Sequence, residues 1–221
     1  RQPSYSQVGV YIILYSSLKN TTYFREDVDL GDGDLKFNTV DFNGDGKQEI
    51  LMTYDNPDKD DPDLGFNNYY YLIEYTPSHT LRTFKKGGYP SGSHSVYPGD
   101  FNGDGKTDIL TCTNEIGWTV GYATGDMGYL TGTGFHEDRI TGLRNTPPEP
   151  SFGIFIADYN GDGKQDILQK VDLGSPGTEF NILYSTGSGF EHAQLLSSDR
   201  FSANEQSFIT DLNGDGKAEL M

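Results

Sequence analysis

Short apolar runs separated by turn residues recur along the whole chain, and helical spacing is nowhere sustained. Runs such as "EILMTY" (49–54), "YYLIEYT" (70–76) and "WTVGYA" (118–123) are rich in β-branched and aromatic residues. Clusters of Gly, Pro, Asn and Ser stand between them. Apolar runs of this length, bounded by turn residues, predict β-strands rather than helices. The pattern therefore indicates an all-β protein.

One acidic stretch occurs four times. It reads "DFNGDGKQEIL" from Asp41, "DFNGDGKTDIL" from Asp100, "DYNGDGKQDIL" from Asp158 and "DLNGDGKAELM" from Asp211. We call these copies motifs 1 to 4 and number positions from the first aspartate. Successive first aspartates lie 59, 58 and 53 residues apart. A near-constant period of this size predicts a repeat architecture.

Each unit between motifs holds about four strands. A strand follows the motif directly, a second ends in an aromatic and a small residue, a weaker third follows, and a fourth runs into the next motif. Four strands per unit is the plan of a β-propeller blade. We therefore predict one β-propeller domain over residues 1–221. Its repeat units are 41–99, 100–157, 158–210, and 1–40 together with 211–221.

The two ends of the chain complement each other. Residues 211–221 hold a motif and the start of a first strand, whereas residues 1–40 hold a second, third and fourth strand without a first. Pairing of the C-terminal strand with the N-terminal blade would close a ring of four blades and hide two sheet edges. The alternative is that these residues are part of a larger propeller.

Oxygen-bearing side chains stand at positions 1, 3, 5 and 9 of every motif. Alternate residues of a tight loop point inward, and the backbone carbonyl of position 7 supplies another oxygen. Oxygen donors without His or Cys select Ca²⁺ over zinc or copper, and glycines at positions 4 and 6 permit the sharp turn. We expect the lysine amine of position 7 to point to solvent. The predicted ligands of about four calcium ions are Asp41, Asn43, Asp45, Lys47, Glu49, Asp100, Asn102, Asp104, Lys106, Asp108, Asp158, Asn160, Asp162, Lys164, Asp166, Asp211, Asn213, Asp215, Lys217 and Glu219.

Two other interpretations of the motif fit the sequence less well. An EF-hand needs a glutamate at the end of its loop, but motifs 1 to 3 have Met52, Thr111 and Gln169 there, followed by β-forming residues. Asx and glycine turns without metal explain N-G and D-G, but not the acid at position 9 of all four copies. Four Ca²⁺ would bring the formal charge from −17 to about −9.

The repeated pattern resembles the FG-GAP/VCBS family of calcium-bearing β-propeller repeats, over all four units. Such repeats occur in integrin α-chain heads, fungal lectins, some polysaccharide lyases and bacterial surface or toxin-complex proteins. The family's calcium positions carry over onto the residues just given. "FG" occurs only at Phe152–Gly153, and "YSTGSGF" (184–190) resembles bacterial Rhs-associated propellers. The resemblance is closest to the VCBS-like bacterial branch, which implies an extracellular or cell-surface location.

Composition limits the classes of partner and chemistry. With 33 acids against 16 bases, the chain would be repelled by nucleic acid and anionic membranes, and no apolar run approaches the roughly 18 residues of a membrane span. Cys112 reads as a small apolar residue. The four histidines (His79, His94, His136 and His192) lie in different units without zinc spacing, and no catalytic motif occurs. We therefore predict a protein that is not an enzyme.

The longest loops share the face opposite the motifs, and function usually resides in such loops. They are 55–68, 85–95, 142–151 and 172–179, with Phe66, Tyr69, Tyr89 and Trp118 as nearby aromatics. For Tyr69 and Trp118 a place in the core is favoured. The leading hypothesis is a calcium-stabilised interaction or scaffold module of a larger secreted or surface bacterial protein, with a protein partner. The alternatives are a glycan-binding lectin and an accessory propeller of a polysaccharide-active enzyme.

Overall fold

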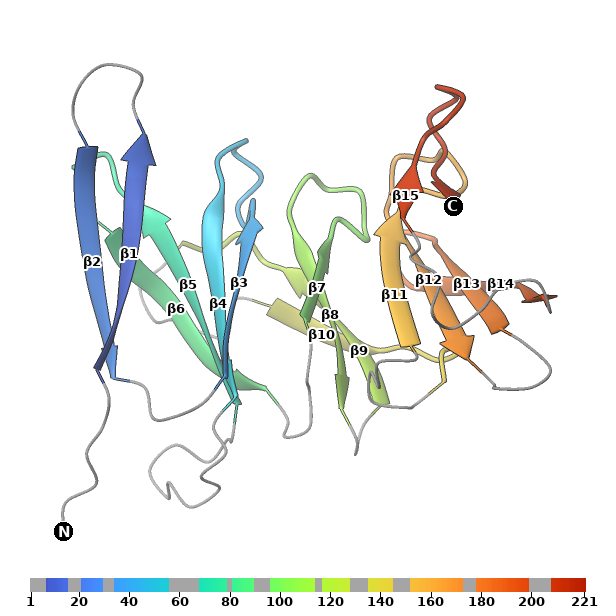
Figure 1. Cartoon of the computed structure of the whole chain (residues 1–221), viewed down its shortest axis with the longest axis horizontal. Helices are drawn as coiled ribbons and strands as arrows, with labels where there is room; N and C mark the ends of the chain where they lie inside the picture. Colours follow the sequence, from blue (N-terminus) through green and yellow to red (C-terminus); the bar gives the residue numbers. More distant parts are fainter. Residues whose placement is uncertain are drawn as a thin grey trace, which may run out of the picture. The chain divides into compact units, whose positions relative to one another are not determined.

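The structure, a computed structural model, is built from β-strands. It describes residues 7–15, 21–29, 34–55, 68–78, 81–89, 96–113, 117–127, 135–144, 152–172, 178–198 and 208–221. Every regular element in these ranges is a strand (Figure 1), and no helix in them is long and apolar enough to cross a membrane. The predicted all-β class is confirmed.

The chain divides into two compact units, which are described separately. Unit 1 comprises Arg1–Val40, Gly46–Ser91 and Asp126–Gly134, and unit 2 comprises Asp41–Asp45, Gly92–Gly125 and Phe135–Met221. Unit 1 contains one four-stranded sheet and unit 2 contains two, all antiparallel. Four strands per repeat therefore agree with propeller-like blades.

Each four-stranded sheet is a meander in chain order. In unit 1 it consists of β3 (Asp34–Val40), β4 (Glu49–Asp55), β5 (Asn68–Tyr75) and β6 (Leu81–Tyr89). The first sheet of unit 2 consists of β7 (Val96–Gly99), β8 (Asp108–Thr113), β9 (Gly117–Ala123) and β10 (Phe135–Arg139). The second consists of β11 (Phe152–Ala157), β12 (Asp166–Asp172), β13 (Thr178–Ser185) and β14 (Phe190–Ser198).

Each motif is the hairpin loop between the first two strands of one sheet. The residue before position 1 pairs with position 9 in every copy: Val40 with Glu49, Gly99 with Asp108, Ala157 with Asp166 and Thr210 with Glu219. The expectation that the motif joins the fourth strand of one blade to the first strand of the next is therefore wrong. The strand before each motif and the strand after it belong to the same sheet. Each sheet therefore begins with the strand that we had assigned as the last strand of the preceding repeat unit.

Two shorter sheets lie at the ends of the sequence. β1 (Gln7–Tyr15) pairs with β2 (Thr21–Asp29), and β15 (Ile209–Thr210) pairs with β16 (Glu219–Leu220). The strand expected as the fourth of the N-terminal blade is β3, which instead belongs to the sheet of β4, β5 and β6. β16 is hydrogen-bonded to β15 and not to the N-terminal strands, so the predicted closure is not shown.

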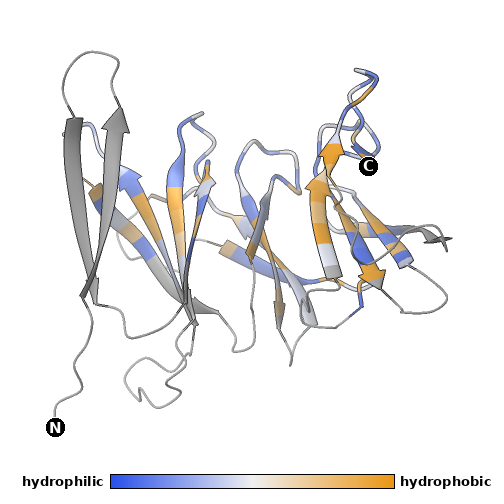
Figure 2. Cartoon of the chain, viewed as in Figure 1, coloured by the Kyte–Doolittle hydropathy of each residue, from blue (hydrophilic) through white to orange (hydrophobic). Residues whose placement is uncertain are grey.

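The core of unit 2 is formed by the apolar faces of its sheets. Trp118 is 2% exposed and lies in a cluster with Phe101, Leu110, Cys112 and Leu183, among others. The favoured core position of Trp118 is confirmed, and Trp118 therefore cannot stack on a sugar at the surface. Cys112, which we expected to be a half-buried apolar residue, is 4% exposed and thus buried more fully than expected. In Figure 2 the strands carry apolar bands, whereas the loops that hold the motifs are largely hydrophilic. The scaffold thus presents the acidic residues of positions 1 and 5 at hairpin ends, outside the packed core.

Candidate metal centre

The aspartate at position 1 organises each acidic loop, by which we mean positions 1 to 8 of a motif. In loop 2 (100–107), Asp100 Oδ1 accepts the N–H groups of Gly103 (2.7 Å) and Asp104 (3.2 Å), and its Oδ2 accepts that of Gly105 (3.0 Å). Asp158 and Asp211 accept amides of positions 4 and 6 in loops 3 (158–165) and 4 (211–218) in the same way. In loop 4 these backbone hydrogen bonds, above all that from Gly216, lower the pKa of Asp211.

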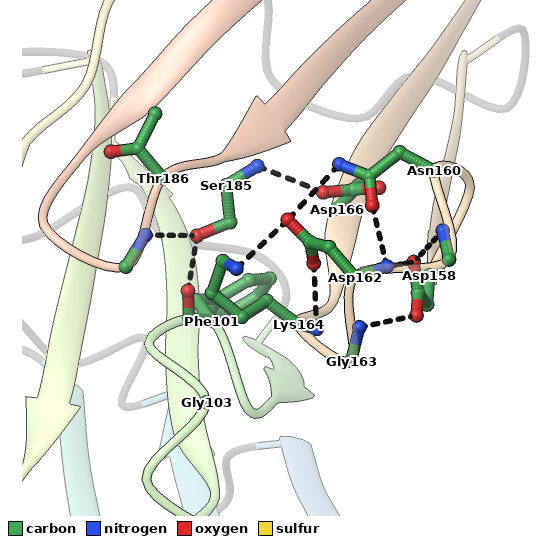
Figure 3. A network of polar contacts seen from close by, with 12 residues as sticks. Phe101, Gly103, Asp158, Asn160, Asp162, Gly163, Lys164, Asp166, Ser185 and Thr186 are labelled. Atoms are coloured by element: carbon green, nitrogen blue, oxygen red, sulfur yellow. Dashed lines mark hydrogen bonds and ion pairs between the residues drawn. The ribbon is translucent and has the colours of Figure 1, made fainter.

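The oxygens at positions 3 and 5 are aimed by the same kind of contact. In loop 3, Asn160 Oδ1 accepts the N–H of Asp162 (2.8 Å), and Asp162 Oδ1 accepts the N–H of Lys164 (2.9 Å) (Figure 3). Loops 2 and 4 repeat both hydrogen bonds. The glycines at positions 4 and 6 all have φ between 74° and 85°, a region that other residues enter only at a cost. The sequence thus wraps a string of side-chain oxygens around one short loop.

The acid at position 9 is buried in motifs 1 to 3. Asp108 and Asp166 are 0% exposed. Asp108 Oδ2 accepts the N–H of Phe101 (3.0 Å) and its Oδ1 accepts that of Ala123 (2.8 Å). Asp166 accepts the N–H of Tyr159 and of Ser185. Burial raises the pKa of Asp108 to about 7, because desolvation outweighs the two backbone hydrogen bonds. Burial raises the pKa of Asp166 as well. A nearby cation would lower the free-energy cost of ionising these buried carboxylates.

The lysines at position 7 differ from the expectation. Lys106 forms an ion pair with Asp104, and Lys164 Nζ lies 2.8 Å from Asp162 Oδ2. The prediction that the amine points to solvent is therefore wrong for these two lysines, because each returns to the carboxylate at position 5. These contacts help to lower the pKa of Asp162; they also lower that of Asp104, where they outweigh the opposing effect of burial.

Carboxylates converge most closely in loop 4 and the strand after it. One oxygen each from Asp211, Asp215 and Glu219 lies within 4.8 Å of the other two. Two oxygens that bind one Ca²⁺ at 2.3–2.6 Å can lie up to about 5 Å apart, so this spacing fits a shared ion. Without a cation, these like-charged carboxylates repel one another. The donor set of loop 4 therefore fits calcium.

Motif 1 is divided between the two units. In unit 2, Asp41 Oδ1 accepts the N–H groups of Gly44 (2.8 Å) and Asp45 (3.1 Å), and Asn43 Oδ1 accepts that of Asp45 (2.9 Å). These contacts repeat those of loops 2 and 3. Lys47 and Glu49 belong to unit 1, where Glu49 is 5% exposed. The predicted side-chain oxygens of positions 1 and 3 therefore have the same local arrangement here.

Position 8 links consecutive acidic loops, a role that the sequence analysis missed. Its N–H donates to the carbonyl of position 1 in the preceding loop: Thr107 to Asp41 (2.7 Å), Gln165 to Asp100 (2.9 Å) and Ala218 to Asp158 (2.8 Å). In return, the N–H of Asp41 donates to Thr107 Oγ1 (2.9 Å), and that of Asp100 to Gln165 Oε1 (2.8 Å). The sequence feature that could have indicated this link is the polar residue at position 8 of motifs 1 to 3.

The aromatic residue at position 2 also reaches the next sheet. The rings of Phe42 and Phe135 meet edge to face at 5.6 Å, and those of Phe101 and Phe190 at 5.8 Å. Phe135 and Phe190 are the first residues of β10 and β14. Such pairs contribute about 0.5–1.5 kcal/mol beyond burial of their area. Loops 1 and 2 are therefore anchored to the following sheet by apolar contact as well as by hydrogen bonds.

Two of the predicted function-bearing loops meet at the opposite ends of the strands. Arg144 of loop 142–151 forms a bidentate ion pair with Glu179 of loop 172–179, at 3.0 and 2.8 Å. Trp118 Nε1 donates to the Arg144 carbonyl (2.8 Å). The predicted sharing of one face by these two loops is thus confirmed. The structure does not describe the rest of loops 142–151 and 172–179, nor most of loops 55–68 and 85–95. Phe66 and the side chains of Tyr69 and Tyr89 also lie outside the described residues.

Among the residues that the structure describes, the other titratable candidates form no second site. His136 and His192 are exposed on β10 and β14, as predicted, whereas His79 and His94 lie outside the described residues. Burial raises the pKa of the Cys112 thiol to about 11, so the thiolate nucleophile is scarce at neutral pH. In the part of the chain that the structure describes, the acidic motifs are therefore the strongest candidates for chemistry.

Comparison with known proteins agrees with this arrangement. Residues 41–111, which hold motif 1, the sheet strands after it and motif 2, match the family described as FG-GAP-like repeat. The chain contains an FG-GAP-like repeat. The match spans motifs 1 and 2, whereas motifs 3 and 4 lie outside it. No curated protein matches the chain.

A solved structure has a similar fold. It is described as the structural basis of specific recognition of non-reducing terminal N-acetylglucosamine by an Agrocybe aegerita lectin. The likeness has a TM-score of 0.65 at 15% sequence identity and covers 97% of this chain. This chain spans 55% of the length of that lectin chain. At this identity the comparison supports the fold alone.

Proposed function

We propose that the chain is a calcium-stabilised β-propeller module that serves binding rather than catalysis. The observation that carries the proposal is the convergence of Asp211, Asp215 and Glu219 within 4.8 Å, a spacing that one Ca²⁺ can bridge. The other three motifs repeat the same residue types at the same positions. Each ion is held by the side chains of positions 1, 3, 5 and 9 and the carbonyl of position 7.

Calcium stabilises the fold by two routes. The ion neutralises carboxylates that otherwise repel one another, including the buried acids Asp108 and Asp166. It also binds the folded loop and not the unfolded chain, which adds folding free energy by linkage. Because each loop closes the first hairpin of its sheet, the ion fixes the start of each blade.

The biological role we propose is an interaction or scaffold module of a larger secreted or surface protein. The loops opposite the motifs carry the binding surface, and the Arg144–Glu179 ion pair keeps two of them together. A rigid scaffold with variable loops at one end suits recognition of a protein partner. The acidic surface, with a formal charge of −17, makes nucleic acid an unsuitable ligand.

Glycan binding is the second candidate. The likeness to the lectin from Agrocybe aegerita supports it, whereas the difference in length and content among the four long loops favours a protein partner. An array of immobilised glycans that includes terminal N-acetylglucosamine separates the two. Saccharide binding that is competed by free sugar would favour the lectin, and an empty array would favour the protein partner.

Thermal unfolding tests the calcium assignment. The melting temperature is measured after treatment with EDTA, and again after addition of millimolar Ca²⁺ or Mg²⁺. We expect EDTA to lower it by many degrees and Ca²⁺ to restore it more fully than Mg²⁺, because Mg²⁺ requires a smaller octahedral site. A melting temperature that is the same with EDTA and with Ca²⁺ would contradict the assignment.

A further inference from the structure

We propose that neighbouring acidic loops bind calcium cooperatively, through the hydrogen bonds between position 8 of each loop and position 1 of the loop before it. The inference rests on the proposed calcium function. Its structural basis is the repeated bridge from Thr107 to Asp41, from Gln165 to Asp100 and from Ala218 to Asp158. The bridge is built from the same segments that hold the predicted ligands.

One peptide group connects the ion to the bridge. The carbonyl of Lys106, a predicted calcium ligand, and the N–H of Thr107 belong to the same peptide unit. That N–H donates to the carbonyl of Asp41 at 2.7 Å. A cation on the carbonyl oxygen polarises the peptide and makes its N–H a stronger donor, because linked hydrogen bonds polarise one another. Calcium in loop 2 therefore tightens the contact with loop 1.

The acceptor is the residue that organises the earlier loop. Asp100 receives the bridge from Gln165 on its backbone carbonyl, and its backbone N–H donates to Gln165 Oε1 at 2.8 Å. The carboxylate of the same residue holds three amides of its own loop. When Gln165 is fixed, Asp100 is fixed as well. The first ion thus contributes part of the ordering that the second loop requires.

Side-chain packing couples the same loops. A Cβ added to Gly103 would lie 2.9 Å from Lys164 Cγ, and one added to Gly161 would lie 3.2 Å from Lys217 Cγ. The stem of each position-7 lysine therefore passes directly over the position-4 glycine of the preceding loop. A loop that changes shape displaces this lysine, whose carbonyl is a predicted ligand in the next loop.

The four motifs supply variants with a matched control. Thr107→Val keeps the shape of the side chain and removes the acceptor of the Asp41 N–H, and Gln165→Ala creates the residue type already present at position 8 of motif 4. Gln48→Ala is the control. Gln48 occupies position 8 of motif 1, is exposed, and has no acidic motif before it in residues 1–40.

Isothermal titration of the metal-free full chain with CaCl₂ tests the inference, with circular dichroism to verify folding. The wild-type chain and Gln48→Ala should bind with a Hill coefficient above 1. Thr107→Val and Gln165→Ala should lower this coefficient and weaken the later binding steps by roughly fivefold, the low end of typical coupling.

The outcomes separate the inference from the proposed function. Binding of several ions with a Hill coefficient of 1, or equal coefficients for Gln165→Ala and Gln48→Ala, would overturn cooperativity and leave calcium binding intact. Absence of any calcium binding by the folded wild-type chain would overturn both.

Discussion

The glycine at position 4 is expected to be more sensitive to substitution than the glycine at position 6 of the same loop. Gly103 and Gly105 have φ of 76° and 83°, so alanine at either position costs about 1 kcal/mol in backbone strain. At Gly103 the new Cβ would also lie 2.9 Å from Lys164 Cγ, whereas at Gly105 no atom lies within 4 Å. Overpacking of this kind adds about 1–3 kcal/mol. We therefore expect a loss of about 1 kcal/mol for Gly105→Ala and at least twice that for Gly103→Ala.

Urea unfolding in constant calcium measures these free energies. Gly214→Ala serves as a second control, because Gly214 has φ of 75° and open space around the added Cβ. In the double variant Gly103→Ala/Lys164→Ala the excess cost should disappear, since the clashing stem is gone. Equal losses for Gly103→Ala and Gly105→Ala, or an excess that survives Lys164→Ala, would refute the packing of lysine over glycine.

Three further predictions concern pH, an ion pair and a thiol. Without calcium, the free energy of unfolding should fall as the pH rises from about 4 to 7. The raised pKa of Asp108 lets the folded state hold a proton that the unfolded state has lost over this range. In Asp108→Asn the free energy of unfolding should depend less on pH. Arg144→Ala should cost about 1 kcal/mol in urea unfolding, because the Glu179 side chain is 9% exposed but the Arg144 side chain is 50% exposed and solvent screens the ion pair; an unchanged free energy would refute this. Cys112, buried, should react with a thiol reagent only as fast as the chain opens; a rate independent of denaturant would contradict its burial.

The strands and the hairpin loops could be predicted from the sequence because their signals are local. "DILTCT" and "WTVGYA" became β8 and β9, and the turn residues between them mark the boundaries. The motif was recognisable because oxygen-bearing residues alternate with glycines. These features depend on neighbours within about ten residues, which the sequence displays directly.

The assignment of strands to sheets was not predictable in the same way. The strand before a motif can pair with the strand after it or with the preceding strand, and the apolar pattern is the same in both cases. The pairing of Gly99 with Asp108 shows that the strand before motif 2 forms a hairpin with the strand after it. A tight acidic loop suits a hairpin connection, because its two ends must lie one strand spacing apart.

The contacts between acidic loops were missed because their key groups belong to the backbone. The N–H of Thr107 and the carbonyl of Asp41 leave no mark on the sequence, and position 8 varies between Gln, Thr and Ala. The lysine prediction failed for a related reason. Lys164 bends back to the carboxylate two residues earlier, because its stem is confined by the preceding loop.

The central claim is that each of the four acidic loops binds one calcium ion. Its most direct test is the metal content of the folded chain after dialysis against millimolar CaCl₂ and a brief wash, measured by plasma mass spectrometry together with protein concentration. We predict about four calcium ions per chain, and about one fewer for each replacement of a position-1 aspartate, such as Asp211→Asn. A folded chain that carries no calcium would contradict the account.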